Sequence, residues 1–119
     1  MSHKRIADAV KVPTTAADQR RGDMAYVVSA VWTAKPGKED LVRDVIRQLT
    51  PLSRAEPGCR FYQPHVDPAE PRVFRLFEIY NNEDAYKAHA ESEHFQRLVL
   101  GQAIPALEAR ERAFYETFE

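Results

Sequence analysis

Cysteine, net charge and long apolar runs are scarce in this sequence, and each shortage excludes a class of protein. The single cysteine, Cys59, cannot form an internal disulfide, which favours a reducing cytoplasm. The 17 Lys and Arg nearly balance the 18 Asp and Glu, whereas a nucleic-acid binder usually carries a basic excess. No apolar run approaches the roughly 18 residues of a membrane span, and MSHKRIADAVKV lacks the apolar segment of a secretory signal. We expect a cytoplasmic protein that binds neither nucleic acid nor membrane.

Glycine is also scarce, and its positions exclude the common nucleotide-binding motifs. The four glycines lie at turns or at the ends of expected elements. No P-loop, dinucleotide-binding glycine motif or GxSxG motif is present. We therefore expect no bound nicotinamide, flavin or other cofactor.

The chain divides into a short polar segment and one folded domain, as its 119 residues allow. Residues 1–23 include KVPTTAADQRRGD, which has almost no large apolar side chain. We interpret them as a flexible N-terminal arm. The alternative is a short helix over residues 6–12 that lies on the surface or on a partner. Residues 24–119 form the expected domain.

Hydrophobic periodicity in this domain predicts alternating strands and helices. Apolar alternation predicts strands, apolar spacing of three and four predicts helices, and Pro, Gly, Asn and Ser mark the boundaries. The expected elements are a strand over 24–34, a helix over 38–55, strands over 59–66 and 72–80, helices over 83–90 and 93–103, and a strand over 112–118. The order βαββαβ predicts an α+β, ferredoxin-like domain with a four-stranded antiparallel sheet.

Two of the expected strands are apolar on both faces. In the first strand, Tyr26, Val28, Ala30 and Trp32 alternate with Val27 and Val31; in the third, Phe74, Leu76 and Tyr80 alternate with Val73, Phe77 and Ile79. Helices can cover only one face, and burial of the other would stabilise by about 25 cal/mol per Å². We therefore expect a homodimer in which two sheets pack together.

Four short motifs occur in a distinctive order. They are Lys35-Pro-Gly-Lys-Glu, Glu56-Pro-Gly-Cys, Phe77-Glu-Ile-Tyr-Asn-Asn-Glu-Asp-Ala-Tyr-Lys-Ala-His and Ser92-Glu-His-Phe. With this spacing the chain resembles the antibiotic biosynthesis monooxygenase family over residues 24–118. The resemblance implies a dimeric α+β barrel of the kind often named as quinol monooxygenases. The same fold also hosts polyketide oxygenases, haem-degrading enzymes and an isomerase.

Departures from the family patterns argue against haem degradation. Haem-degrading relatives use an Asn, a Trp and a His. Here the only Asn residues are Asn81 and Asn82, the only Trp is Trp32, and Val99 and Leu100 stand where the His would be. Polyketide-oxidising relatives place an Asn and a Trp on the third strand and a Tyr on the following helix. The matching residues here are Leu76, Tyr80 and Tyr86, so the identity of the substrate stays open.

His89 and Glu78 are the candidate catalytic residues. His89 follows Tyr86 by three positions, so both side chains lie on one helical face. It serves either in proton transfer or substrate binding, or it docks the helix by bonding a backbone carbonyl or Glu78. By strand alternation Glu78 shares a face with Leu76 and Tyr80. A buried carboxylate there must be paired, either with an arginine such as Arg60 or Arg75, or with His89, which it would orient.

The spacing of His89 and His94 argues against a metal site. Five helical residues correspond to a rotation of about 140°, so the two side chains should not share a face. A zinc-binding pair on a helix is typically four residues apart, and no third ligand is adjacent in the sequence. We expect no metal, and we interpret His94 as a helix-start or surface residue.

The resemblance implies a cofactor-independent monooxygenase that uses O2. Its substrate would be an electron-rich phenol, hydroquinone or polyketide-like aromatic that the protein deprotonates. His89 would be the base, oriented by Glu78, with His65 or Glu78 as the other candidate bases. The residues expected to contact the substrate are Tyr80, Tyr86, Leu76, Trp32 and Tyr62. The alternative is an isomerase of a small carbonyl compound or a ligand-binding protein on the same barrel.

Overall fold

The helices and strands follow each other in the predicted order in a computed structural model that describes residues 24–119. The arm expected over residues 1–23 lies outside the described residues. The elements are β1 (Tyr26–Ala34), α2 (Glu39–Arg54), β2 (Cys59–Asp67), β3 (Glu70–Tyr80), α3 (Glu83–Glu91), the π-helical η1 (Phe95–Ala103), the 3-10 turn η2 (Ile104–Ala106) and β4 (Leu107–Glu116).

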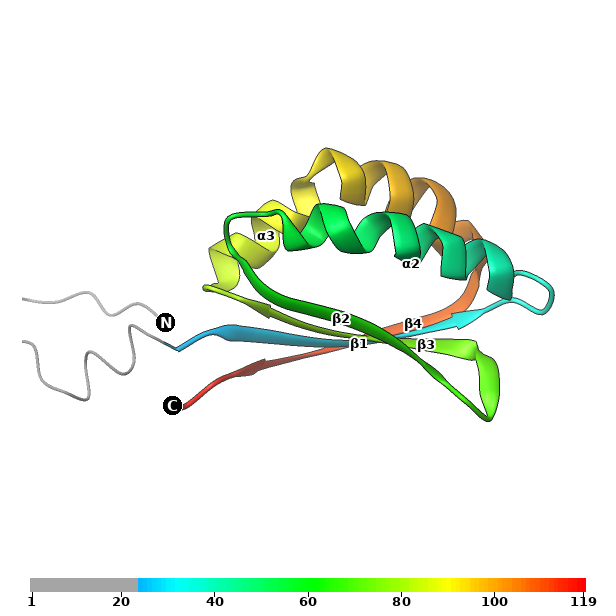
Figure 1. Cartoon of the computed structure of the whole chain (residues 1–119), viewed down its shortest axis with the longest axis horizontal. Coiled ribbons are helices and arrows are strands. Elements are labelled where there is room, and N and C mark those ends of the chain that lie inside the picture. Colours follow the sequence, from blue (N-terminus) through cyan, green and yellow to red (C-terminus); the bar gives the residue numbers. More distant parts are fainter. Residues whose placement is uncertain (1–23) are drawn as a thin grey trace, which may run out of the picture.

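The strands form one antiparallel sheet in the order β2-β3-β1-β4, and the helices cover one of its faces (Figure 1). This arrangement confirms the predicted ferredoxin-like βαββαβ fold. The sheet of a single chain is open, so the barrel that the resemblance implies is not closed within residues 24–119.

The predicted boundaries of the last helix and the last strand were inaccurate. Strand β4 begins at Leu107 rather than at residue 112, because it pairs with β1 along its length, from Ala34 opposite Leu107 to Tyr26 opposite Glu116. Charged residues dominate its first half, which hid the strand from an apolar pattern. The segment expected as an α-helix over residues 93–103 is the π-helical η1.

Helix α2 forms because its apolar side chains recur at helical spacing. Val42, Val45, Ile46 and Leu49 are buried on one stripe that packs against β2 and η1. Pro51 lies in the last turn and does not end the helix, which continues to Arg54.

The sheet has one covered and one open face, and both carry apolar side chains. On the helix side, the buried core includes Ala30, Trp32, Phe74 and Leu76. On the open side, the relative exposures are 45% for Phe61, 39% for Phe77 and 58% for Tyr115. The predicted alternation of β1 and β3 is therefore confirmed. An exposed patch of this kind is typical of an interaction surface.

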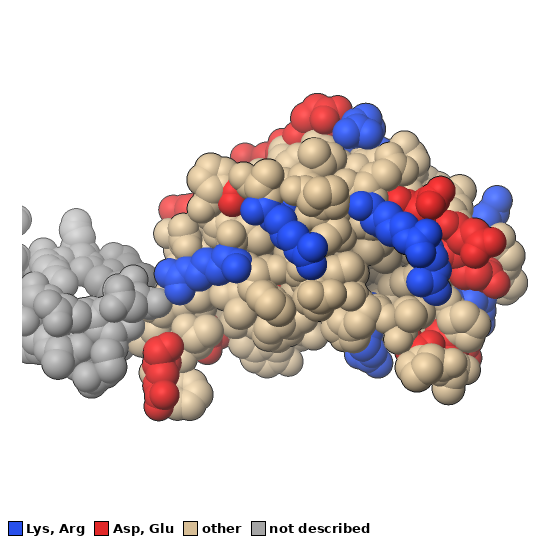
Figure 2. All heavy atoms as spheres, viewed as in Figure 1, with Lys and Arg blue, Asp and Glu red and all other residues tan. Residues whose placement is uncertain are grey.

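The charged side chains do not gather into one patch on the face drawn in Figure 2. Basic and acidic groups are interspersed over that face. Within residues 24–119, no helix combines the length and the apolar character needed to cross a membrane.

Candidate functional site

The imidazole of His89 lies inside the domain among aromatic rings. Its side chain projects from α3 toward the sheet and is only 2% exposed. Ring centroids of Tyr80 and Phe95 lie 5.2 Å away, and that of Tyr86 lies 6.0 Å away. The predicted placement of Tyr86 and His89 on one helical face is confirmed. His89 is therefore a buried polar group in an otherwise aromatic environment.

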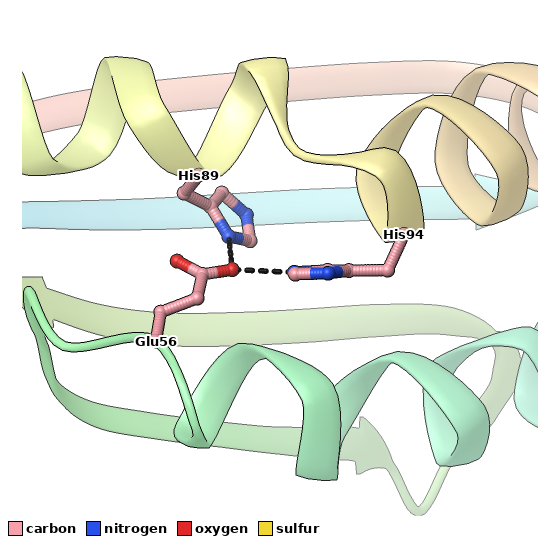
Figure 3. Close-up of side chains that lie close together, drawn as sticks. All are labelled: Glu56, His89 and His94. Atoms are coloured by element: carbon pink, nitrogen blue, oxygen red, sulfur yellow. Dashed lines mark hydrogen bonds and ion pairs between the residues drawn. The ribbon is translucent and has the colours of Figure 1, made fainter.

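One carboxylate oxygen joins His89 to His94 (Figure 3). Glu56, in the loop after α2, has its Oε2 2.8 Å from His89 Nδ1 and 2.5 Å from His94 Nε2. The expectation that the two histidine side chains diverge was wrong, and Glu56, which is 33 residues from His89 in the sequence, lies beside both. His94 is also not a plain surface residue, because its side chain is 16% exposed.

The helix break at Ser92 explains this convergence. Ser92 has an extended backbone with ψ of 156°, so α3 ends and the chain resumes in a new direction. Its hydroxyl donates to the His89 carbonyl over 2.7 Å and accepts from the Phe95 amide over 3.2 Å. A rotation of about 100° per residue holds only within one continuous helix.

The contact with Glu56 determines which nitrogen of His89 faces the core. An ionised carboxylate only accepts hydrogen bonds, so Nδ1 of His89 carries the proton that points to Glu56. In the neutral ring Nε2 then has a free lone pair. This nitrogen lies 3.9 Å from Oε1 of Glu78. His89 is thus held at one nitrogen and available for proton transfer at the other.

Glu78 is paired with a tyrosine rather than with an arginine. The Tyr80 hydroxyl donates to Glu78 Oε1 over 2.6 Å. Burial raises the pKa of Glu78, which the Tyr80 hydrogen bond and the nearby His89 partly offset. Burial and the Glu78 carboxylate also raise the pKa of Tyr80 far above its ordinary value, so Tyr80 stays a hydrogen-bond donor.

Of the two alternatives for Glu78, a salt bridge with Arg60 or Arg75 was wrong. Arg60 donates instead to Asn81 Oδ1 over 2.7 Å. Arg75 alternates with the buried Leu76 along β3 and is exposed. Since Glu78 is buried on the helix side of the sheet, neither guanidinium shares its environment.

Two arginines of β4 border the site, and sequence reasoning missed both. Arg112 Nη1 donates to the Tyr86 hydroxyl over 2.8 Å. The Arg110 guanidinium lies 5.9 Å from the centroid of the Phe95 ring. Burial, and secondarily Arg112, lowers the pKa of Arg110. Both arginines lie on the helix side of β4, opposite Trp32 and Ala30 of β1. Arg110 lies outside the strand predicted over residues 112–118, and Arg112 is the first residue of that prediction.

The other predicted contact residues divide between this site and the main core. Tyr62 is buried, with its ring centroid 6.0 Å from that of His89. Leu76 and Trp32 belong to the large core cluster that includes Leu49 and Leu98. Within residues 24–119, Nε1 of Trp32 has no hydrogen-bond partner.

His65 stands apart from the other candidate bases. It is exposed on β2, where its Nδ1 lies 3.3 Å from the Gln63 carbonyl oxygen. By alternation along β2 it lies on the face opposite Tyr62, which is the open face of the sheet. The structure therefore does not bring His65 to the Glu78 and His89 pair.

A row of aromatic rings connects the buried imidazole to the surface. Phe114 on β4 is 42% exposed, and its ring centroid lies 5.6 Å from that of Tyr86. Tyr86 in turn contacts the His89 ring. An open hollow of about 290 Å³ adjoins the site on its other side and is lined partly by Cys59 and Tyr62. His89 does not line this hollow.

Comparison with known proteins shows which family the sequence matches and which solved structures share its fold. Residues 25–99 match the family model described as antibiotic biosynthesis monooxygenase. The crystal structure of a protein named antibiotic biosynthesis monooxygenase is 28% identical in sequence and superposes with a TM-score of 0.69. The match covers 77% of this chain and 95% of the other protein. A protein of Shewanella oneidensis shares the fold, with a TM-score of 0.74 and 23% identity, over 80% of this chain and 92% of that one.

A curated relative is longer than the matched region. An uncharacterized protein of Synechocystis sp. is 30% identical over 87 residues, which make up 73% of this chain. The match spans only 59% of the length of that relative.

Proposed function

Because the chain belongs to the antibiotic biosynthesis monooxygenase family, we propose that it is a cofactor-independent monooxygenase of an electron-rich aromatic substrate. The substrate would be a phenol, a hydroquinone or a polyketide-like aromatic. The observation that carries the proposal is the position of His89. Glu56 holds its Nδ1, while Nε2 faces Glu78 among the rings of Tyr80 and Tyr86.

In the proposed first step, His89 Nε2 accepts the proton of a substrate hydroxyl. Glu56 then stabilises the imidazolium through Nδ1, which keeps the ring in the orientation that proton transfer needs. The hydrogen bond between Glu78 and Tyr80 holds the Glu78 carboxyl group beside the His89 ring. Glu78 is a positioning residue in this scheme.

The phenolate would be stabilised by donors at the same end of the site. The Tyr86 hydroxyl accepts from Arg112, so its own proton is available to a substrate oxygen. Arg112 adds positive charge behind it. Hydrogen-bond donors held in a desolvated site favour the developing negative charge. Tyr80, Tyr62 and Phe95 supply apolar surface for a flat ring.

The phenolate is electron-rich enough to pass one electron to O2. The resulting radical pair combines at a ring carbon that carries hydrogen, which forms a peroxide, and the His89 imidazolium returns its proton to the outer oxygen. Loss of the ring hydrogen as a proton, with cleavage of the O–O bond, then releases water and leaves a carbonyl at that carbon. One oxygen atom enters the product and the other leaves as water. The two electrons that reduce the second oxygen come from the substrate, so the protein needs to supply only a base, donors and a dry aromatic site.

An oxygen electrode tests the proposal directly. Wild-type protein in chelator-containing buffer is given a panel of hydroquinones, and O2 uptake is compared with the uncatalysed rate. Replacing His89 with Gln should reduce turnover by about 100- to 10,000-fold, the usual contribution of a general base. Glu93→Gln is the control and should keep full turnover, because the Glu93 side chain is 76% exposed. Full turnover in His89→Gln would refute the assigned base.

A non-oxidative reaction is the second candidate. The pairing of His89 with Glu78 across 3.9 Å would also suit a proton shift in a small carbonyl compound. Such an isomerase would convert its substrate without consuming O2, and a plain ligand-binding protein would convert nothing. O2 uptake that follows product formation in a one-to-one ratio therefore separates the candidates.

The proposed active form is a cytoplasmic homodimer. Phe61, Phe77 and Tyr115 leave apolar surface on the open face of the sheet, and a second copy would cover it. Sedimentation at micromolar concentration should give twice the chain mass of 13.7 kDa. A monodisperse species at the single-chain mass would refute the dimer. A reducing compartment suits the unpaired thiol of Cys59.

A further inference from the structure

We propose that Glu56, His89 and His94 form a binding site for a divalent transition-metal ion of the zinc type. The three residues each offer one ligand atom, and these atoms all lie within 4.8 Å of one another. They come from three separate segments, namely the loop after α2, the end of α3 and the residue before η1 (Figure 3). Both imidazoles point at the same carboxylate.

The spacing of the ligand atoms is close to that of a coordinated ion. Zinc bonds of about 2.1 Å in a tetrahedron separate neighbouring ligand atoms by about 3.4 Å. Here Glu56 Oε2 lies 2.8 Å from His89 Nδ1 and 2.5 Å from His94 Nε2. Binding therefore requires each of these two contacts to lengthen by less than about 1 Å, and the two ring nitrogens, which lie within 4.8 Å of each other, to reach a similar separation. In each imidazole the ion takes the place of the N–H proton on the ligating nitrogen, and the other ring nitrogen carries that proton instead.

The donor set selects the class of ion. Two imidazoles and one carboxylate are borderline ligands that suit Zn²⁺, Co²⁺ or Fe²⁺, whereas Mg²⁺ and Ca²⁺ prefer oxygen alone. Three protein ligands leave at least one position for water or another small ligand. The site is partly accessible, because the side chains of Glu56 and His94 are 14% and 16% exposed.

A second carboxylate supports the deepest ligand. A histidine that binds metal through one nitrogen usually donates the other N–H to a carboxylate or carbonyl. Glu78 Oε1 lies 3.9 Å from His89 Nε2, in position to take this role. A carboxylate ligand such as Glu56 also contributes negative charge that a bound dication neutralises.

The backbone around the ligands is fixed before any ion binds. The Glu56 amide donates to the Ser53 carbonyl, and the Glu56 carbonyl accepts from the Cys59 amide, each over 3.1 Å. Ser92 ties the end of α3 to the start of η1. Preorganisation of this kind lowers the ordering cost of binding.

The inference does not rest on the proposed oxygenase activity. A metal on Nδ1 would require the single N–H proton of the neutral His89 ring to move to Nε2, so the loaded protein would lack the proposed base. If both proposals hold, Zn²⁺ inhibits O2 uptake. Binding is measured independently of that activity, so the two proposals can fail separately.

Calorimetric titration of the chelator-treated full chain with Zn²⁺ tests the site. All samples carry His3→Gln, because His3 lies outside the described residues and could bind the probe. We expect one ion per chain. His94→Gln and Glu56→Gln should each weaken Zn²⁺ binding more than about 100-fold. Glu78→Gln should weaken it only about 10- to 100-fold, the loss typical of a residue that supports a ligand. His65→Gln should change nothing.

Three outcomes would overturn the site, and one of the measurements leaves Glu56, His89 and His94 unsubstituted, so it does not depend on a variant that misfolds. The proposal fails if no ion binds, or if binding is unchanged in folded His94→Gln. Nitrogen NMR of the histidine rings in protein that carries only His3→Gln should show Zn²⁺ shifting Nδ1 of His89 and Nε2 of His94. Shifts confined to His65 would also refute the site.

Discussion

Replacing Glu78 with Gln should change how the stability of the protein depends on pH. Burial raises the pKa of Glu78, so the folded state favours its protonated form more than the unfolded state does. Gln keeps the size and can still accept the hydrogen bond from the Tyr80 hydroxyl. The substitution therefore removes mainly the ionisable group, and the difference between the two proteins isolates the contribution of that group.

The sign follows from proton binding. Between the ordinary carboxyl pKa of 4.5 and the raised folded value, the folded protein holds a proton that the unfolded chain has released. The free energy of unfolding of the wild type therefore falls as pH rises through this window, relative to Glu78→Gln. Below the window Glu78 is protonated in both states, and this contribution to the difference is constant. The slope inside the window is at most about 1.4 kcal/mol per pH unit for one group.

Urea unfolding of both proteins from pH 4 to 8, at one protein concentration and with chelator, measures this difference. Glu93→Gln is the control, since the Glu93 side chain is 76% exposed, and its difference from wild type should stay nearly flat. The reasoning would be refuted if the free energy of unfolding of the wild type rose with pH relative to that of Glu78→Gln. A flat difference would also refute it, because a raised pKa of Glu78 requires a slope in this window.

Three further substitutions or modifications test the packing. Leu49→Ala should cost about 2–5 kcal/mol in urea unfolding because Leu49 is 1% exposed, while Leu52→Ala, at a site 40% exposed, should cost far less. Gly58→Ala should destabilise the protein by about 1–3 kcal/mol and lower its melting temperature, because the new Cβ would lie 2.5 Å from the Cβ of Ala85. An unchanged melting temperature would contradict this contact. Burial raises the pKa of the Cys59 thiol from 9.0 to about 11, so iodoacetamide at pH 8 should label it about 100-fold more slowly than an ordinary thiol, and equal rates would refute the shift.

Local periodicity was enough to place the candidate catalytic pair. Three-residue spacing put Tyr86 and His89 on one helical face, and strand alternation put Glu78 beside Tyr80 on the helix side of β3. The same alternation showed that β1 and β3 are apolar on both faces. These predictions depend only on residues within one element, where the backbone repeat determines the direction of each side chain.

Contacts between elements were outside the reach of such patterns. The Glu56 carboxylate meets His89 and His94 only because Ser92 ends α3 and turns the chain, which a fixed rotation per residue cannot describe. Arg112 reaches Tyr86 only because β4 pairs with β1 at the far edge of the sheet.

The sequence by itself determined the order of elements, the family and the faces of the strands, since these follow from short-range periodicity and from motif spacing. The tertiary structure alone decided the partners of the buried charges. A buried carboxylate or imidazole must find a hydrogen-bonding partner, and the nearest available one depends on how separate segments pack. Glu78 therefore bonds Tyr80 rather than an arginine, and Glu56 lies between two histidines.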